Sequence, residues 1–140
     1  SKEHERKLSL MMLDIDYFKA VNDTHGHAVG DAVLKEFALR LQRSIRGVDL
    51  ASRYGGEEFV VMMPDTDLNQ AQMVAERVRQ SISDDIFETE MVAPLSITVS
   101  IGLAIYEEEH DTPESLMKRA DISLYRAKRE GRNRTVYDAA

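Results

Sequence analysis

Two pairs of acidic residues stand at places where carboxylates could bind metal ions. Asp14 and Asp16 close an apolar run near the start of the chain, and Glu57 and Glu58 directly follow a pair of glycines. Four carboxylates gathered at one place repel one another unless they are protonated or share cations. Carboxylate oxygens without thiolate or imidazole partners favour Mg²⁺ or Mn²⁺. The alternative is that both pairs are ordinary solvated acids on surface loops.

Basic residues and a helix start provide groups that can bind phosphate. Lys19 belongs to the turn that follows the first acidic pair, where backbone N–H groups at the beginning of a helix can hold an anion. Lys128 and Arg132 lie four residues apart at the end of the last predicted helix. The helix dipole favours cations there in any case, so these two residues alone do not establish a ligand site.

Apolar periodicity and capping residues predict the elements that must position these groups. Apolar alternation and short apolar runs indicate strands, whereas apolar residues three and four apart indicate helices. Capping residues, an N-terminal proline and a closing glycine mark helix ends. The expected strands are 8–14, 50–54, 58–63, 95–106 and an edge strand at 135–137; the expected helices are 16–24, 31–45, one capped by Asp67 that reaches Ile82, and one opened by Thr112-Pro113 and closed by Gly131.

The glycine pair predicts a tight hairpin between two of these strands. Gly55 and Gly56 separate the expected strands 50–54 and 58–63. A two-residue hairpin turn requires positive φ angles, which glycine accepts. We therefore expect a two-residue turn that presents Glu57 and Glu58 at its exit.

The order of the elements predicts an α+β fold. The order is strand, two helices, two strands, helix, strand, helix and edge strand. It contains a ferredoxin-like βαββαβ core with a mainly antiparallel sheet. In that topology strand 8–14 lies antiparallel to strand 58–63, so Asp14 and Glu57 are expected to meet at one edge of the sheet. Neither an internal repeat nor a linker-like change of composition interrupts the sequence, and we expect residues 1–140 to form one domain.

Composition limits the classes of partner. The net charge of −7 argues against non-specific nucleic-acid binding, which depends on clustered cations. Small polyanions remain possible where local cations or metal ions offset the repulsion. The absence of cysteine excludes disulfides and thiolate metal sites. The apolar stretches are too short to span a bilayer, which predicts a cytoplasmic domain without membrane contact. The charged residues 1–7 are expected to fray.

Several motifs, spread in order along the chain, resemble those of one family. The segment Arg53-Tyr54-Gly55-Gly56-Glu57-Glu58-Phe59 is similar to the signature of GGDEF domains in its GGEEF form. The stretches 14–27, 30–31, 100–102, 120–128 and 131–133 match the same family. The chain thus resembles GGDEF-domain diguanylate cyclases, whose fold is similar to the palm of nucleotidyl cyclases and polymerases. A lone GGEEF would be a weak indication, but the ordered set is specific.

The resemblance implies an activity and a set of metal ligands. Diguanylate cyclases condense two GTP molecules into cyclic di-GMP and release two pyrophosphates, with Mg²⁺ or Mn²⁺ as cofactor, two ions per site. Asp14, the backbone carbonyl of Ile15, and Glu57 would hold one ion, and Glu58 would be available to the second. Asp14, Glu57 and Glu58 would then be the catalytic acids. Because each domain binds one GTP, a second copy of the same domain is the implied partner.

The resemblance also assigns the substrate contacts. Asn22 and Asp31 would read the guanine base, because aspartate accepts from its N1–H and amino groups, a donor pair that adenine lacks. From the residues alone, Asn22 as a helix C-cap and Asp31 as an N-cap are equally good interpretations. The remaining implied contacts to the substrate are Phe18, Lys19, Gly55, Gly56, Lys128 and Arg132.

A further motif implies product feedback. Arg46 and Asp49 have the spacing of the family's RxxD inhibitory site, where cyclic di-GMP binds, and Arg77 matches a second arginine there. The arginine fork pairs with guanine O6 and N7 and also contacts phosphate. The alternative is an ordinary arginine at a helix end followed by an aspartate in a turn.

Departures from the family keep other interpretations open. The family's DxLTGLxNRR segment precedes the first strand and is absent here, which predicts a fragment without its upstream regulatory region, compatible with a membrane anchor elsewhere in a longer protein. The main alternative is a catalytically silent domain that serves as a receptor for cyclic di-GMP or GTP. Others are a palm-like nucleotidyl transferase for a different nucleotide, which Asn22 and Asp31 disfavour, and a purely structural ferredoxin-like domain.

Overall fold

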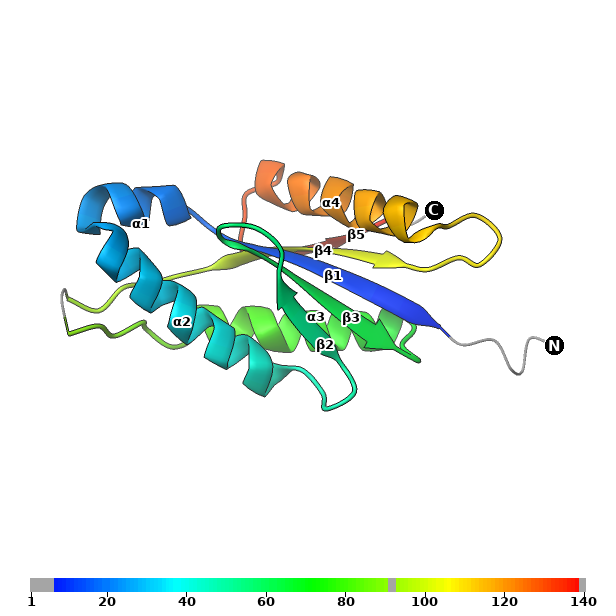
Figure 1. The fold of residues 1–140 in the computed structure, drawn as a ribbon, viewed down its shortest axis with the longest axis horizontal. Coiled ribbons are helices and arrows are strands. Elements are labelled where there is room, and N and C mark those ends of the chain that lie inside the picture. Colours follow the sequence, from blue (N-terminus) through cyan, green and yellow to red (C-terminus); the bar gives the residue numbers. More distant parts are fainter. Residues whose placement is uncertain (1–6, 91–92, 139–140) are drawn as a thin grey trace.

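The computed structural model describes residues 7–90 and 93–138. The expectation of fraying for residues 1–7 therefore lies outside the described residues except at Lys7, whose carbonyl accepts a hydrogen bond from the backbone N–H of Thr66 at 3.1 Å. Five strands and four helices follow one another in the expected order within these ranges (Figure 1). They are β1 (Leu8–Ile15), α1 (Phe18–His25), α2 (His27–Ser44), β2 (Leu50–Arg53), β3 (Glu58–Pro64), α3 (Leu68–Ser83), β4 (Val99–Ile105), α4 (Pro113–Arg129) and β5 (Thr135–Tyr137).

The strands form a single sheet of order β2-β3-β1-β4-β5. The first three pairings across the sheet are antiparallel, and β5 runs parallel to β4. Without β5 this is the strand order of the ferredoxin-like βαββαβ unit. The predicted α+β class, the ferredoxin-like core and the mainly antiparallel sheet are therefore confirmed.

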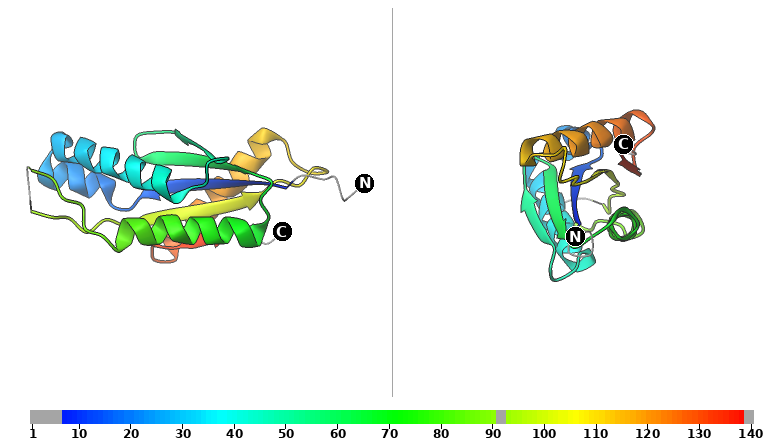
Figure 2. Two further views of the ribbon diagram at one scale, coloured as in Figure 1. Left: turned by 90° about the horizontal axis from the view of Figure 1, so that it is seen from below. Right: turned by 90° about the vertical axis from the view of Figure 1, so that its right-hand side faces the viewer.

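Helices cover both faces of the sheet. Met11, Leu13 and Ile15 of β1 belong to the core that includes residues of α2 and α3. Leu10 and Met12 belong to a smaller core with residues of α4. Figure 2 shows α4 on one side of the sheet, with α2 and α3 on the other. This division follows from the two-residue period of a strand, because consecutive side chains point to opposite faces.

The helix starts that the sequence marks are formed as expected. The side chain of Asp67 accepts a hydrogen bond from the backbone of Gln70, and the Gln70 side chain accepts one from the backbone of Asp67, which completes a capping box. Thr112 caps α4 in the same way with Ser115, and Pro113 takes the first helical position. Among the described residues, no helix is both long and apolar enough to cross a bilayer.

Two elements begin four residues away from the sequence expectation. α2 begins at His27, four residues before the expected start, because Gly26 at φ 90° ends α1 and directly begins α2. β4 begins at Val99 and not at 95, since Leu95 pairs only with Phe87 in an isolated bridge. The second error arises because the apolar pattern of β4 continues back to Leu95 across a change of backbone conformation.

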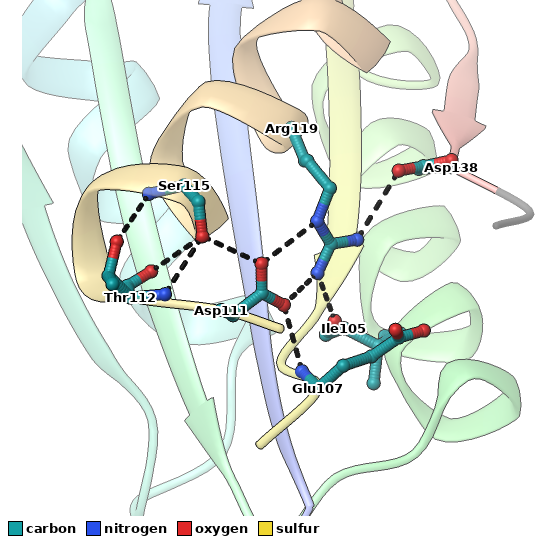
Figure 3. A network of polar contacts seen from close by, with 7 residues as sticks. All are labelled: Ile105, Glu107, Asp111, Thr112, Ser115, Arg119 and Asp138. Carbon is teal, nitrogen blue, oxygen red and sulfur yellow. Dashed lines mark hydrogen bonds and ion pairs between the residues drawn. The ribbon is translucent and has the colours of Figure 1, made fainter. Parts of the chain in front are cut away.

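An ionic network fixes the N-terminal end of α4 (Figure 3). The guanidinium of Arg119 binds the carboxylates of Asp111 and Asp138 and donates to the carbonyl of Ile105 at 2.6 Å. Asp111 also accepts from the backbone of Glu107 at 2.8 Å and from the hydroxyl of Ser115 at 2.8 Å. These donors, Arg119 first, hold the pKa of Asp111 at about 2. The network therefore anchors the start of α4 to the end of β4 and to the segment after β5.

The middle of α4 rests directly on the backbone of β4. A Cβ atom added at Gly102 would come within 2.2 Å of the Leu124 backbone nitrogen and 2.3 Å of the Ala120 carbonyl oxygen. Backbone atoms of a packed helix cannot move aside as a flexible side chain can. Gly102 thus sets how closely α4 approaches the sheet.

Gly102→Ala should therefore destabilise the domain by about 2–3 kcal/mol, as overpacking of a well-filled core typically does. Gly47→Ala is the matched control, because its Cβ would meet nothing within 4 Å. A glycine replaced by alanine at such a position stabilises a protein by about 0.4–1 kcal/mol. Urea denaturation of both variants measures the difference, and equal stabilities would contradict the close approach of α4.

Candidate functional site

The predicted site residues gather at the end of the sheet where β1 terminates. A hollow of about 400 Å³ opens there, between the end of β1, the start of α1, the glycine hairpin and the end of α4. Figure 1 shows these four segments at the same end of the sheet, opposite the start of β1. The predicted site residues that line it are Asp14, Ile15, Phe18, Lys19, Glu57, Lys128 and Arg132.

The register of β1 and β3 brings the acidic residues together. Asp14 lies opposite Glu58 in the ladder, and the backbone N–H of Ile15 donates to the carbonyl of Glu57 at 3.3 Å. Residues two apart on a strand share a face. Asp14 therefore follows Met12 onto the α4 face of the sheet. The juxtaposition expected for Asp14 and Glu57 is present, with Glu58 as the direct cross-strand neighbour.

Asp14 is the most strongly perturbed acid of this cluster. Its side chain is only 8% exposed, and it accepts a hydrogen bond from the ammonium group of Lys128. Burial raises the pKa of Asp14 to about 6; the Lys128 ammonium opposes the rise, and the charges of Glu57 and Glu58 add to it. The cluster thus carries more negative charge than Lys128 neutralises.

The oxygen ligands of the site suit a hard divalent cation whose remaining ligands come from the substrate and water. Among the residues that the structure describes, no three acidic or histidine side chains converge closely enough to form a complete metal centre. Mg²⁺ is commonly held by one or two carboxylates together with water and substrate phosphates. Asp14 and Glu57 line the same hollow as Ile15 and satisfy that requirement.

Asp16 does not join the acidic cluster, which corrects the expectation of four converging carboxylates. Its carboxylate is buried and accepts from the hydroxyls of Thr98 and Ser100, both at 2.6 Å. It also accepts from the backbone N–H of Asn133 at 3.0 Å. Both oxygens are engaged by protein donors, so Asp16 serves as an internal acceptor. The spacing in the sequence could not show that Asp14 and Asp16 have different roles, because the partners of Asp16 lie more than 80 residues away.

The glycine hairpin has a different turn from the one predicted. The backbone N–H groups of Tyr54 and Gly55 both donate to the carbonyl of Glu58, at 2.8 and 3.2 Å, so three residues form the connection. Neither glycine has a positive φ, and an added Cβ at Gly56 would meet nothing within 4 Å. The prediction of a two-residue turn with positive φ was therefore wrong. The fold itself does not require glycine at Gly55 or Gly56.

The start of α1 offers an anion-binding arrangement. The N-cap residue Tyr17 has φ 58° and provides no side-chain cap to the helix. Lys19 points outward with its side chain 90% exposed and pairs with Asp23 at 3.1 Å. The guanidinium of Arg132 lies over the ring of Tyr17, 4.6 Å from its centroid. The sequence analysis did not predict the contact of Tyr17 with Arg132, because the two residues lie far apart in the sequence and no motif relates them.

Asn22 and Asp31 lie inside helices, which excludes the capping roles that the sequence left open. Asn22 is within α1, and Asp31 is an exposed residue of α2, whose N-cap is Gly26. The Asn22 amide covers Gly30 so closely that an added Cβ would lie 1.8 Å from Asn22 Oδ1. Among the described residues that buried oxygen has no hydrogen-bond partner. Asp31 lines a neighbouring groove of about 780 Å³ between α2 and β2.

The predicted inhibitory residues meet at the far end of α2. Both carboxylate oxygens of Asp49 are bound by the Arg46 guanidinium, at 3.0 and 2.7 Å, and the Asp49 side chain is fully buried. Arg46 also donates to the hydroxyl of Thr66. Arg77 reaches the same place from α3 and donates to the carbonyl of Ser44 at 2.6 Å. The sequence motif gave no indication that Arg46 also neutralises a buried acid.

Comparisons with known proteins agree on one family. The family profile described as "Diguanylate cyclase, GGDEF domain" matches residues 1–134. Response regulator PleD of Caulobacter vibrioides is 52% identical over 137 residues, which cover 95% of this chain. They cover only 30% of PleD, so the chain spans about a third of the length of that relative.

Solved structures of similar domains have the same fold. The GGDEF domain of DgcB from Caulobacter crescentus in complex with c-di-GMP matches with a TM-score of 0.90 and 36% identity, over 96% of this chain and 80% of that one. The active GGEEF domain of a diguanylate cyclase from Vibrio cholerae matches with a TM-score of 0.87 and 33% identity, over 97% and 85%.

The raised pKa of Asp14 predicts a pH-dependent effect of its removal. An acid whose pKa is 3.8 when unfolded and about 6 when folded destabilises the folded state above pH 6 and has no effect below pH 4. Without added metal, Asp14→Asn should raise the free energy of unfolding at pH 8 by up to about 3 kcal/mol, and the gain should vanish toward pH 4.

Urea denaturation of the parent and the variant at pH 8, 6 and 4 measures this difference. Asp121→Asn provides the control, because Asp121 is an exposed acid on α4. A gain for Asp14→Asn that stays constant across the three pH values would contradict the assignment of the raised pKa to this residue.

Proposed function

Because this chain belongs to the diguanylate cyclase GGDEF-domain family, we propose that it condenses two GTP molecules into cyclic di-GMP with the help of Mg²⁺. The observation that carries the proposal is the cluster of Asp14, Glu57 and Lys128 in one hollow beside the start of α1. Carboxylates for a metal ion and cations for phosphate oxygens stand together there, as phosphoryl transfer requires.

The residues of the cluster have complementary tasks in this proposal. Asp14, Glu57 and the Ile15 carbonyl hold the cation, and Glu58 is available to a second ion. When bound, Mg²⁺ lowers the pKa of a coordinated hydroxyl and stabilises negative charge on the attacking and leaving oxygens. The GTP triphosphate offers Lys128 an alternative to its ion pair with Asp14, which frees the carboxylate for the metal ion.

Phosphate contacts come from the start of α1 and the end of α4. The uncapped N–H groups at Phe18 and Lys19 can donate to phosphate oxygens. Arg132 and Lys128 supply positive charge from the other side of the same hollow. Gly55 and Gly56 have no structural need for a missing side chain, which supports a role in the close approach of the nucleotide to the hairpin.

Guanine selection is assigned to the junction of α1 and α2. The buried Asn22 Oδ1 lacks a donor among the described residues, and Asp31 lies exposed on the next helix. A base with an amino group and an N1–H can satisfy both acceptors, which adenine cannot. Leaving the buried Asn22 Oδ1 unsatisfied costs about 1–3 kcal/mol, a penalty that discriminates against the wrong base.

The reaction requires two copies of the domain. In each half-reaction the 3′-oxygen of one GTP forms a bond to the α-phosphorus of the other, the bond to pyrophosphate breaks, and the hydroxyl proton leaves. Each chain contains one such site, so two domains must face each other with their nucleotides in line. We propose that the domain acts within a longer, dimeric protein, whose regulatory region sets this encounter.

Product feedback is assigned to Arg46, Asp49 and Arg77. Two arginines at the end of α2 offer forked donors to the guanine bases and phosphates of cyclic di-GMP. Arg46 would then exchange part of its pairing with Asp49 for the ligand. Inhibition follows if the product binds the unproductive arrangement of the domains more tightly than the productive one.

Removal of the metal-binding charge should abolish turnover and leave the fold intact. In a domain dimerised by a parallel coiled coil fused to its N-terminus, Glu57→Gln should lower the rate of cyclic di-GMP formation from GTP and Mg²⁺ by about a hundredfold or more. The product is identified by its mass, and Glu109→Gln in the distant loop before α4 is the control. Tight binding of GTP or cyclic di-GMP by a parent that forms no product would support the receptor alternative.

The feedback proposal is best tested at Arg77, since Arg46→Ala would also leave the buried Asp49 without its cation. Arg77→Gln should weaken cyclic di-GMP binding at least tenfold, or about 1.4 kcal/mol, while the initial rate without added product stays unchanged. Arg43→Gln, an exposed arginine on the last turn of α2, provides the control. Calorimetric titration measures the affinity, and unchanged binding would show that Arg77 has no part in it.

A further inference from the structure

The turn that carries Arg132 has an unusual backbone. Gly131, Arg132 and Asn133 follow α4 with φ values of 126°, 64° and 47°, so three consecutive residues lie in the left-handed region. Glycine and asparagine adopt such angles readily, whereas an arginine does so at a cost. A strained conformation persists only where the surrounding structure determines it.

Two side chains hold this turn from opposite directions. The buried carboxylate of Asp16 accepts from the backbone N–H of Asn133 at 3.0 Å. Arg79 of α3 donates to the Asn133 side-chain oxygen at 2.9 Å and is itself held by Glu76. Both contacts involve a charged partner and are therefore stronger than neutral hydrogen bonds. Asn133 is thus fixed by its backbone and by its side chain.

Asp16 also fixes the surface on which the Arg132 side chain rests. Its neighbour Tyr17 lies under the Arg132 guanidinium. The carboxylate of Asp16 binds Thr98 and Ser100, and its own backbone N–H donates to the carbonyl of Thr98 at 2.9 Å. The same residue therefore ties the end of β1 to the start of β4 and to the turn after α4.

From this arrangement we infer that Asp16 and Arg79 are positioning residues for phosphate binding. They hold the left-handed turn at Asn133 so that Arg132 lies over Tyr17 and faces the hollow of Asp14 and Glu57. The inference rests on the proposed contact of Arg132 with the triphosphate. Neither Asp16 nor Arg79 touches the substrate in this account; both act through the placement of Arg132.

Asp16 and Asn133 each have a variant that removes part of the contacts with little risk to the fold. Asp16→Ala removes all three side-chain contacts, whereas Asp16→Asn can keep an acceptor toward Asn133 and turn its amide toward the Ser100 hydroxyl. Asn133→Gly keeps the left-handed φ and the N–H group and loses only the contact with Arg79. Arg79→Met removes the same contact from the other side. Arg119→Met, which breaks a comparable ionic anchor at the other end of α4, is the matched control.

The measurement compares two probes, GTP without added metal and guanosine, which lacks phosphate. Asp16→Ala should weaken GTP binding at least tenfold and leave guanosine binding unchanged, and Asp16→Asn should restore most of the loss. Arg79→Met and Asn133→Gly should each weaken GTP binding several-fold, with no further loss in the double variant. Arg119→Met should lower the melting temperature and leave both affinities unchanged.

Arg132→Met separates this inference from the proposed function. If Arg132→Met weakens GTP binding and Arg79→Met and Asn133→Gly do not, the positioning inference is wrong while the phosphate contact stands, even where Asp16→Ala fails to fold. If Arg132→Met leaves GTP binding unchanged, the proposed contact fails and the inference fails with it. In an Arg132→Met background, Asp16→Asn and Arg79→Met should have no additional effect on GTP binding, and an additive loss would contradict action through Arg132.

Discussion

The central position of β1 determines where every group of the site can lie. β1 pairs with β3 on one side and β4 on the other, so its register is fixed twice. A shift of one residue would move its apolar side chains from one face to the other, and cores on both faces oppose that shift. Because the register cannot slip, Asp14 meets Glu58 across one ladder and Ser100 across the other.

The fixed register of β1 also places the carboxylate of Asp14 where its negative charge is unfavourable, and nearby cations offset that cost. Burial at the end of β1 raises the free energy of the charged Asp14, and two neighbouring glutamates increase the repulsion. Although the domain is acidic as a whole, residues 126–134 contain five basic residues and only one acidic residue, a glutamate. These cations are Arg126, Lys128, Arg129, Arg132 and Arg134. In the proposed function, a polyanion with its own divalent cation would complete the charge balance that the Lys128 ion pair provides only in part.

The sequence predicted the features that depend on periodicity and short-range chemistry. The strands, the helix starts at Asp67 and Thr112, and the approach of Asp14 to Glu57 follow from such patterns. What it could not predict depends on backbone conformation and distant partners. Asp14 and Asp16 look alike in sequence and both border the hollow, yet Asp14 accepts from Lys128, whereas both oxygens of Asp16 are bound by Thr98, Ser100 and Asn133. The helix start at His27 depends on the backbone conformation of Gly26, which permits two helices to meet without a loop and which the sequence pattern does not show.

The junction of α1 and α2 makes the number of residues between them important. Gly26 alone separates α1 from α2, so the relative direction of Asn22 and Asp31 depends on the number of residues between them. A single insertion or deletion at Gly26 would leave each helix intact but change the direction in which α2 leaves α1, and with it the placement of Asp31 relative to Asn22. In the proposed function, the spacing of these two residues therefore contributes to base specificity as much as their chemical identity does.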